Sequence, residues 1–190
     1  MPDGSGAGVR RQTRSASVTT GESRFWTFSL AVYADPAVQQ ECLALQDDHS
    51  VDINLLLFCA FVGAVHGAVL SEQVVNEAAN VSRAWQKDVV GALRGARRTL
   101  KRFAAGTSPL DTPIAALRTR VKELELDAER VEQAMLEHWA AVHLDSWPRS
   151  KRLDAVTENI RTLLTMSART SEPVSWPEHL VAAALAPPGQ

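Results

Sequence analysis

The chain of 190 residues lacks most of the features that mark familiar functional classes. Its two cysteines, Cys42 and Cys59, have no CxxC spacing and sit in apolar stretches, so we expect reduced, buried thiols rather than a disulfide scaffold. The 20 basic and 22 acidic side chains give a formal net charge of −2, which provides no global field toward nucleic acid or a membrane. The GSGAG segment at residues 4–8 precedes no strand and is not a phosphate-binding loop. We therefore expect a cytoplasmic protein that uses no cofactor and no metal.

Alternating strand patterns are also missing, and almost every segment has helical periodicity. With 45% apolar and 22% charged residues, the composition is that of an ordinary globular protein. Residues 1–22 are rich in Gly, Ser, Thr and Arg, have no apolar signal-peptide core, and are predicted to form a disordered tail. The sequence predicts an all-α domain over 23–186, a compact bundle of six or seven helices. It would comprise apolar N-terminal helices (23–80), a long antiparallel helical hairpin (82–143) and C-terminal helices (150–186).

Capping residues mark the N-terminal helices. Asp35 followed by Pro36 starts one helix, and Asp52 is the expected N-cap of the next, over 53–70. This helix is apolar enough to raise the question of a membrane span of about 27 Å. Asn54 and His66 interrupt it and no basic residue flanks it, so a central helix of a soluble bundle is the preferred interpretation. Its glycines and alanines predict a face on which another backbone packs closely.

Two stretches with regular apolar spacing predict the hairpin. One stripe runs from Trp85 to Phe103, and a loop containing Gly106 follows it. Beyond the loop come two heptad series, Leu117, Leu124, Val131 and His138, and Ile114, Val121, Ala128, Met135 and Val142. Four heptads indicate a long helix that packs along a partner, with His138 as a seam residue. We expect a C-terminal helix over 151–168, with Leu153 facing inward, to cover the remaining seam. Because a seam can be filled within a chain or between chains, a homo-oligomer stays open.

A polar loop between two buried helices is the first candidate site. Its members are Gln46, Asp47, Asp48, His49, Asp52 and Asn54. Oxygen ligands of this kind could bind a small ligand or a hard cation, with His66 as a further polar group in an apolar surrounding. The spacing matches no EF-hand, however, and the alternative is structural, with Asp52 as a helix cap.

A basic helix face is the second candidate. It comprises Arg83, Lys87, Arg94, Arg97, Arg98, Lys101 and Arg102. Residues 81–110 hold seven basic side chains and one acid, whereas residues 111–145 hold eight acids and four bases. The face could bind an acidic protein partner or nucleic acid, or it could be a solvated face partly neutralised by its hairpin partner. No aromatic side chain alternates with the basic ones, which argues against single-stranded nucleic acid.

The chain carries a family resemblance over about residues 23–164. The pieces FW-FSL-VY, CL-LQD and D-NLLLFC, together with W-KDVVGALRGARRTLK from Trp85 to Lys101, resemble a family of proteobacterial helical proteins known as domain of unknown function 2390. This chain has Ser50 where the family has glycine, Ile53 where valine is common and Gly91 where proline is usual. The resemblance implies a helical fold and no particular reaction.

The function expected from the sequence is that of a non-enzymatic interaction or regulatory module that uses the basic face. No catalytic set is recognisable, and the basic face and the acidic helix are segregated. A small helical ligand-binding protein or enzyme that uses the Gln46–Asn54 loop is the alternative, and nucleic-acid binding is a third.

Overall fold

The computed structural model describes residues 23–104, 109–167 and 174–186, so the predicted tail (1–22) lies outside the described residues. The helices are α1 (Arg24–Tyr33), α2 (Pro36–His49), α3 (Ile53–His66), α4 (Glu72–Trp85), η1 (Gln86–Val90), α5 (Gly91–Phe103), α6 (Asp111–His143), η2 (Leu144–Ser146), α7 (Arg152–Ser167) and α8 (Glu178–Leu185). Because α4, the π-helical turn η1 and α5 form one continuous rod, the described residues make seven rods, counting η2 as the end of α6. The predicted all-α multi-helix fold is confirmed.

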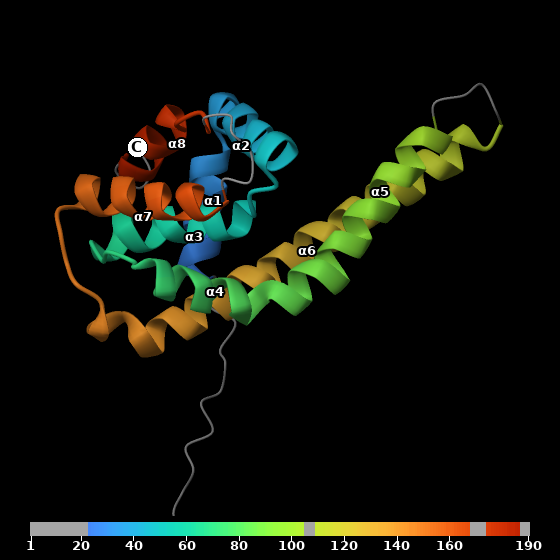
Figure 1. Cartoon of the computed structure of the whole chain (residues 1–190). Helices are drawn as coiled ribbons and strands as arrows, with labels where there is room; N and C mark the ends of the chain where they lie inside the picture. The colour runs from blue at the N-terminus through green and yellow to red at the C-terminus, as the bar shows by residue number, and fades with distance from the viewer. Residues whose placement is uncertain (1–22, 105–108, 168–173, 187–190) are drawn as a thin grey trace, which may run out of the picture.

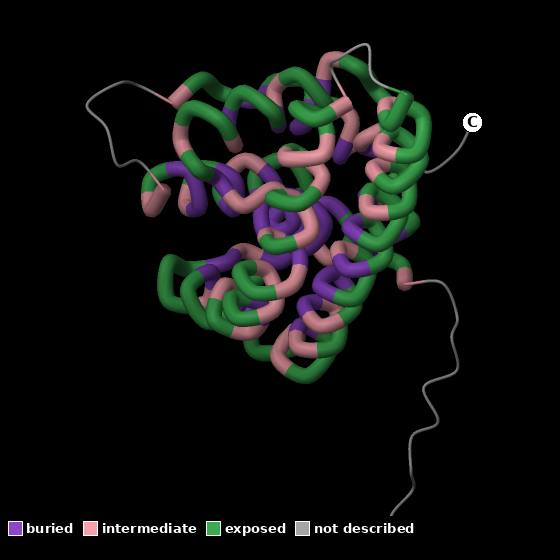
Figure 2. The backbone as a smooth tube through the Cα atoms, turned by 90° about the vertical axis from the view of Figure 1, so that its right-hand side faces the viewer, coloured by how far each residue is buried: buried purple, intermediate pink, exposed green. Residues whose placement is uncertain are grey.

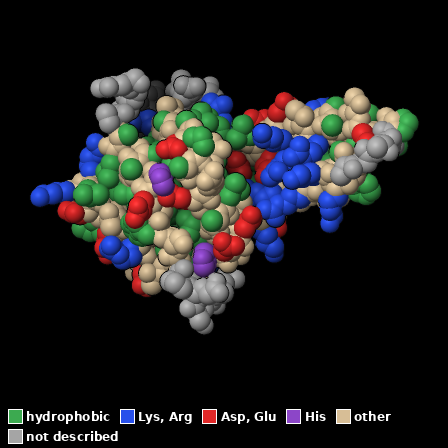
Figure 3. Space-filling view, turned by 90° about the horizontal axis from the view of Figure 1, so that it is seen from above, with side chains coloured by type: hydrophobic (Ala, Val, Ile, Leu, Met, Phe, Trp, Pro, Cys, Tyr) green, Lys and Arg blue, Asp and Glu red, His purple; other side chains and the backbone are tan. Residues whose placement is uncertain are grey.

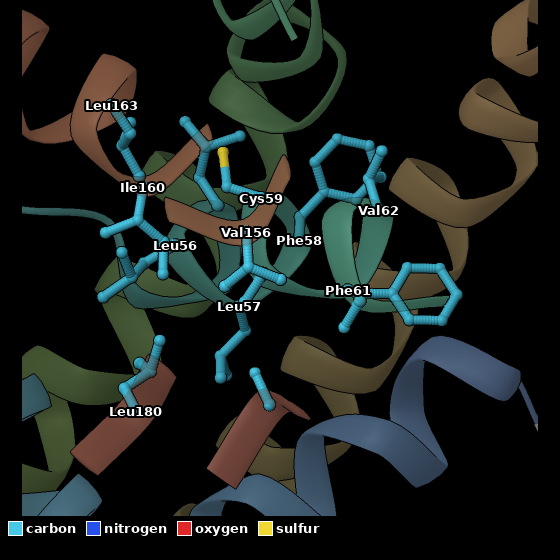
Figure 4. Packing of buried hydrophobic residues seen from close by; sticks show 14 of the residues in the cluster. Leu56, Leu57, Phe58, Cys59, Phe61, Val62, Val156, Ile160, Leu163 and Leu180 are labelled. Carbon is cyan, nitrogen blue, oxygen red and sulfur yellow. The ribbon is translucent and has the colours of Figure 1, made fainter. Parts of the chain in front are cut away.

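Helix α3 lies at the centre of a globular body, as expected from its apolar sequence. Asp52 caps it, its Oδ1 accepting hydrogen bonds from the backbone N–H groups of Asn54 (3.0 Å) and Leu55 (3.3 Å). Phe58 and Phe61 are buried on it, and the ring of Phe25 from α1 stacks on Phe61 with centroids 5.1 Å apart. The buried stretches converge on this helix (Figure 2), where α7 and α8 supply the facing side chains (Figure 4).

The close backbone approach predicted for α3 occurs at Gly63. A Cβ atom placed there would lie 2.6 Å from the backbone nitrogen of Val156, so α7 packs directly on the bare glycine. The helix ends at His66 and not at residue 70 as predicted, because Gly67 takes the left-handed conformation (φ 61°) and caps it. The chain then runs beside α7, where the buried Asn159 side chain accepts from the Leu70 N–H and donates to the carbonyls of Cys59 and Ala68.

An arm extends from this body. The rod made of α4, η1 and α5 leaves the body after α4, and α6 returns antiparallel to it (Figure 1). The predicted antiparallel hairpin is therefore present. Helix α4 continues without a break to Trp85, and the π turn follows it.

One of the two heptad series predicted for α6 is displaced by one residue, whereas the other series includes the buried Ala128 and the half-buried Ile114, Val121 and Met135. The series Leu117, Leu124, Val131 and His138 is exposed, at 47%, 55% and 44% for the three apolar members. The positions one residue further on face inward instead, and two of these, Glu125 and Glu132, are buried. The apolarity of a position is thus misleading here, because the inward positions hold acids that are paired with residues from other helices.

The C-terminal helices do not cover the arm, contrary to the prediction. Helix α7 packs on α3, and α8 packs against α1, α2 and α3. Leu153, expected to face inward, is 55% exposed, whereas Trp147 is buried against Trp139. Within the described ranges, no helix combines the length and the apolarity that a membrane crossing requires.

Candidate ligand site at the root of the arm

A pocket of about 170 Å³ lies where α1, the α2–α3 corner and the root of the arm meet. Its lining comprises Trp26, Ser29, Leu30, Tyr33, Gln46, Asp52, Ile53, Asn54, Leu57, Gln86, Arg94, Leu126, Glu129 and Gln133. One ordered water needs only about 10–15 Å³ of such space, so the pocket has room for a small organic molecule. One wall therefore belongs to the body and the other to the arm.

Asn54 is the hub of the buried polar groups beside the pocket. Its Nδ2 donates to Oε2 of Glu132 at 2.7 Å, and its Oδ1 accepts from Nε2 of Gln133 at 2.9 Å. All three side chains are at least nine-tenths buried, and both partners come from α6, almost eighty residues further along the chain. These bonds fix the first turn of α3 to the arm.

Two carboxyl groups at this hub have raised pKa values. Burial, together with the negative charge of Asp52, raises the pKa of Glu132 to about 8. Burial also raises the pKa of Asp52, against the lowering effects of the Leu55 and Asn54 backbone N–H groups and the weaker effect of Arg94. Removing two acids from water without a cation in direct contact disfavours their charged forms. A cation that binds beside them would favour the charged carboxylates, so its binding would be accompanied by the release of protons.

Four charged residues of the arm form a compensated cluster next to the hub. Arg94 donates from Nε to Glu125 (3.0 Å) and from Nη2 to Glu129 (2.7 Å), and Arg97 also binds Glu125. Burial opposes ionisation of Glu125, but hydrogen bonds from Arg97 and Arg94 hold its pKa below the usual range. The two arginines are therefore occupied by the two glutamates, which leaves Asp52 and Glu132 without an ion-pair partner among the described residues.

Three buried oxygen atoms at the hub have no hydrogen-bond partner among the described residues. They are Oγ of Ser29, Oε1 of Gln133 and Oε1 of Glu132. Ser29 and Gln133 also line the pocket, and they are 4% and 2% exposed. Because a buried polar group without a partner costs about 1–3 kcal/mol, the pocket offers unused hydrogen-bonding capacity to a ligand. The Ser29 hydroxyl and Oε1 of Gln133 can accept, and the hydroxyl and a protonated Glu132 can also donate.

Another hollow is larger, about 580 Å³, and lies between the start of α4, the end of α6 and α7. None of the three unpartnered oxygens faces it, and its one histidine, His143, contacts the Trp139 carbonyl oxygen through Nδ1. The smaller pocket is thus the one that combines space with unsatisfied polar groups.

The residues predicted from the polar loop separate into two groups. Gln46, Asp52 and Asn54 line the pocket, whereas Asp47 and Asp48 are exposed, and Asp47 lies 3.6 Å from Arg98. His66 lies at the other end of α3, its ring edge-on to Phe61 and its backbone carbonyl bound by Arg149. Burial, with Arg24 and Arg149 nearby, lowers the pKa of His66.

The basic face is divided as well. Arg94 and Arg97 point into the cluster, while the remaining members are exposed: Arg83, Lys87, Arg98, Lys101 and Arg102. Lys and Arg side chains gather on the stretch of the arm beside the body, with acidic side chains next to them (Figure 3).

Sequence reasoning missed the α1 and α6 components of the pocket. Ser29, Tyr33, Glu129 and Gln133 line the pocket and Glu132 binds Asn54 beside it, and none of them was among the candidate residues. A signal was present, since Glu125 and Glu132 are one heptad apart at the positions that face the partner helix. Within the described ranges, no group of His, Cys, Asp and Glu is arranged to hold a metal ion.

Comparisons with known proteins give one result. Neither the curated proteins nor the solved structures contain a match to this chain. The family model described as "Protein of unknown function (DUF2390)" matches residues 24–136, which include every residue that lines the pocket. The resemblance inferred from the sequence motifs is thereby confirmed, and the chain belongs to this family.

Proposed function

We propose that the protein binds a small organic cation with N–H donors, such as a primary amine, in the pocket at the root of the arm. The observation that carries this proposal is the presence of buried, unpartnered acceptor oxygens beside two carboxyls that no described cation pairs. An ammonium group supplies three donors and one positive charge, which matches both deficits. Trp26 and Tyr33 add aromatic walls, against which the carbon skeleton of such a ligand would pack.

The cytoplasmic localisation belongs to the same proposal. It is supported by Cys42 and Cys59, which are free and buried and whose thiol pKa values burial raises to about 12. Thiols of this kind suit a reducing compartment such as the bacterial cytoplasm.

Thermal unfolding with a panel of size-matched compounds tests the ligand class. Amines should raise Tm, since a ligand at about 100 times its Kd adds about 2.7 kcal/mol, whereas carboxylic acids and neutral amides of equal size should not. Asp52→Asn retains a good helix cap and removes the carboxyl group. We therefore expect the affinity for amines to fall at least tenfold, and the amine-induced rise in Tm to become smaller. Asp48→Asn is the matched control, because Asp48 is exposed in the same corner and does not line the pocket.

Three outcomes decide the matter. Binding of amines that depends on Asp52 and not on Asp48 supports the proposal. Binding of acids alone would overturn the charge assignment while keeping the pocket. The absence of any shift across the panel would mean that the pocket is structural.

A second candidate function is docking of an acidic protein partner on the exposed part of the basic face, the interaction module expected from the sequence. The observation that favours it is the arm itself, since α5 projects from the body, carries the exposed Arg98, Lys101 and Arg102, and has no buried residue. Arg94 and Arg97 belong to the ion-pair cluster, so the contact would be made by the exposed basic residues.

Charge reversal at the exposed positions tests this candidate. Lys101→Glu with Arg102→Glu should abolish capture of an acidic protein from the native cell extract. Lys151→Glu, which reverses the charge of an exposed lysine of the body, should not. Affinity for nucleic acid that falls steeply with salt would reassign the face to nucleic-acid binding. Capture that survives the double reversal would refute the docking role.

A further inference from the structure

The outer side of α6 carries apolar residues that no described part of the chain covers. Leu117, Leu124 and Val131 recur every seven residues and are about half exposed. Over this stretch the helix advances about 21 Å, so the three side chains form one continuous line along it. Acidic residues occupy the neighbouring positions that face α5. A rotation of α6 that buried the apolar line would therefore separate Glu125 from Arg94 and Arg97.

Two helices alone cannot bury both sides of this arm. Helix α5 has no buried residue, and the buried residues of α6 include the acids Glu125 and Glu132. A heptad line left exposed on such a hairpin is the pattern of a helix that packs on another helix. The charged residues beside the line indicate the identity of this second helix.

Arg120 and Asp127 flank the line on the side away from α5, both exposed and both without an ion-pair partner among the described residues. They lie four residues before and three residues after Leu124, while Leu117 and Val131 lie seven before and seven after. The arrangement is thus nearly symmetric about Leu124 in position and opposite in charge.

We propose that α6 of two copies of this chain pack antiparallel, with the twofold axis at Leu124. Leu124 then contacts the partner's Leu124, Leu117 contacts the partner's Val131, and Arg120 lies beside the partner's Asp127. In a parallel pair the charged residues of the two chains would lie on opposite edges of the contact, too far apart for Arg120 to pair with the partner's Asp127, so the antiparallel arrangement is favoured. The twofold uses the same patch on both chains, as symmetric dimers do. This inference is independent of the pocket and goes beyond the proposed function.

The contact is narrow, and we expect an association of the weak, transient class, which buries less than about 1,200 Å². Dimers should therefore form as the concentration rises from about 1 to 100 μM, the range expected of a weak complex. Sedimentation velocity over this range measures the equilibrium directly.

Disulfide trapping is the sharpest test of the geometry. Leu124→Cys places two thiols at the twofold, so mild oxidation should give a covalent dimer in high yield. Leu153→Cys is the matched control, because Leu153 is equally exposed (55%) but lies on α7. Cys42 and Cys59 are fully buried and do not compete.

Charge exchange tests the direction of packing. Arg120→Asp should shift the equilibrium toward monomer at least tenfold, and adding Asp127→Arg should restore the dimer, with circular dichroism unchanged throughout. A wild-type chain that stays monomeric at 100 μM overturns the proposal. Equal trapping at residue 153, or a double exchange that does not restore association, also overturns it.

Discussion

At the scale of the residue, Asn54 connects the body of the protein to the arm. Its side chain is satisfied on both sides by α6, at Glu132 and Gln133, and its backbone N–H is satisfied by Asp52. Such a bridge replaces apolar packing with a polar contact between segments far apart in sequence. Polar contacts of this kind are directional, and they set the position of the arm on the body more narrowly than leucines would.

The protonation of Glu132 makes this bridge sensitive to pH. Its pKa is raised from 4.5 to about 8 by burial and by Asp52, so the folded state retains a proton that the unfolded state releases. The resulting stability is complete below about pH 4.5 and is lost as the pH rises through about 8. Glu132→Gln should remove this term, leaving a protein that is more stable than wild type at pH 8.5 and similar at pH 5.

Chemical denaturation of both proteins at several pH values measures the difference. The expected slope of the difference is on the order of 1 kcal/mol per pH unit inside the window. Glu123→Gln, which removes an exposed acid from the same helix, is the control. Parallel pH curves for wild type and Glu132→Gln would show that the buried acid does not titrate differently in the two states.

At the scale of the element, glycine has opposite effects in two helices. Gly63 in α3 faces the backbone of Val156 and Ala155 at less than 3 Å from an added Cβ, whereas Gly95 in α5 has nothing within 4 Å. Gly63→Ala should therefore force α3 and α7 apart, with a loss of about 1–3 kcal/mol or more. Gly95→Ala should stabilise the arm by up to about 1 kcal/mol through helix propensity.

Urea unfolding monitored by circular dichroism gives both free energies, and each variant serves as the control for the other. A neutral Gly63→Ala would mean that the α3–α7 contact yields without cost. A destabilising Gly95→Ala would mean that α5 is covered at this point.

The helices differ in how far their sequences predict them. Asp35, Pro36 and Asp52 are local signals, since a cap acts on backbone groups two or three residues away, and all three mark helix starts as expected. The register of α6 is not local. Glu125 faces inward because arginines of α5 bind it, and nothing within one turn of Glu125 reveals that. The end of α3 at Gly67 could have been predicted from the sequence, because glycine is the residue that most often caps a helix in the left-handed conformation.

At the scale of the whole molecule, the body and the arm are stabilised differently. The body has an apolar core centred on α3, which the sequence predicts from composition alone. The arm is held by ion pairs, half-buried leucines and its root. The candidate site follows the same division, since the residues contributed by the α2–α3 corner were predicted and those contributed by α6 were not. Pairing between segments eighty residues apart cannot be derived from either segment.

The unbroken rod from α4 to α5 gives the arm a mechanical property. It spans Glu72–Phe103, about 48 Å, and it passes from the body to the arm without a loop, with the π turn at the crossing point. Gln86 lies on this turn and Arg94 lies two helical turns beyond it, and both side chains line the pocket. A tilt of α5 about the π turn would therefore displace Gln86 and Arg94 and change the width of the pocket.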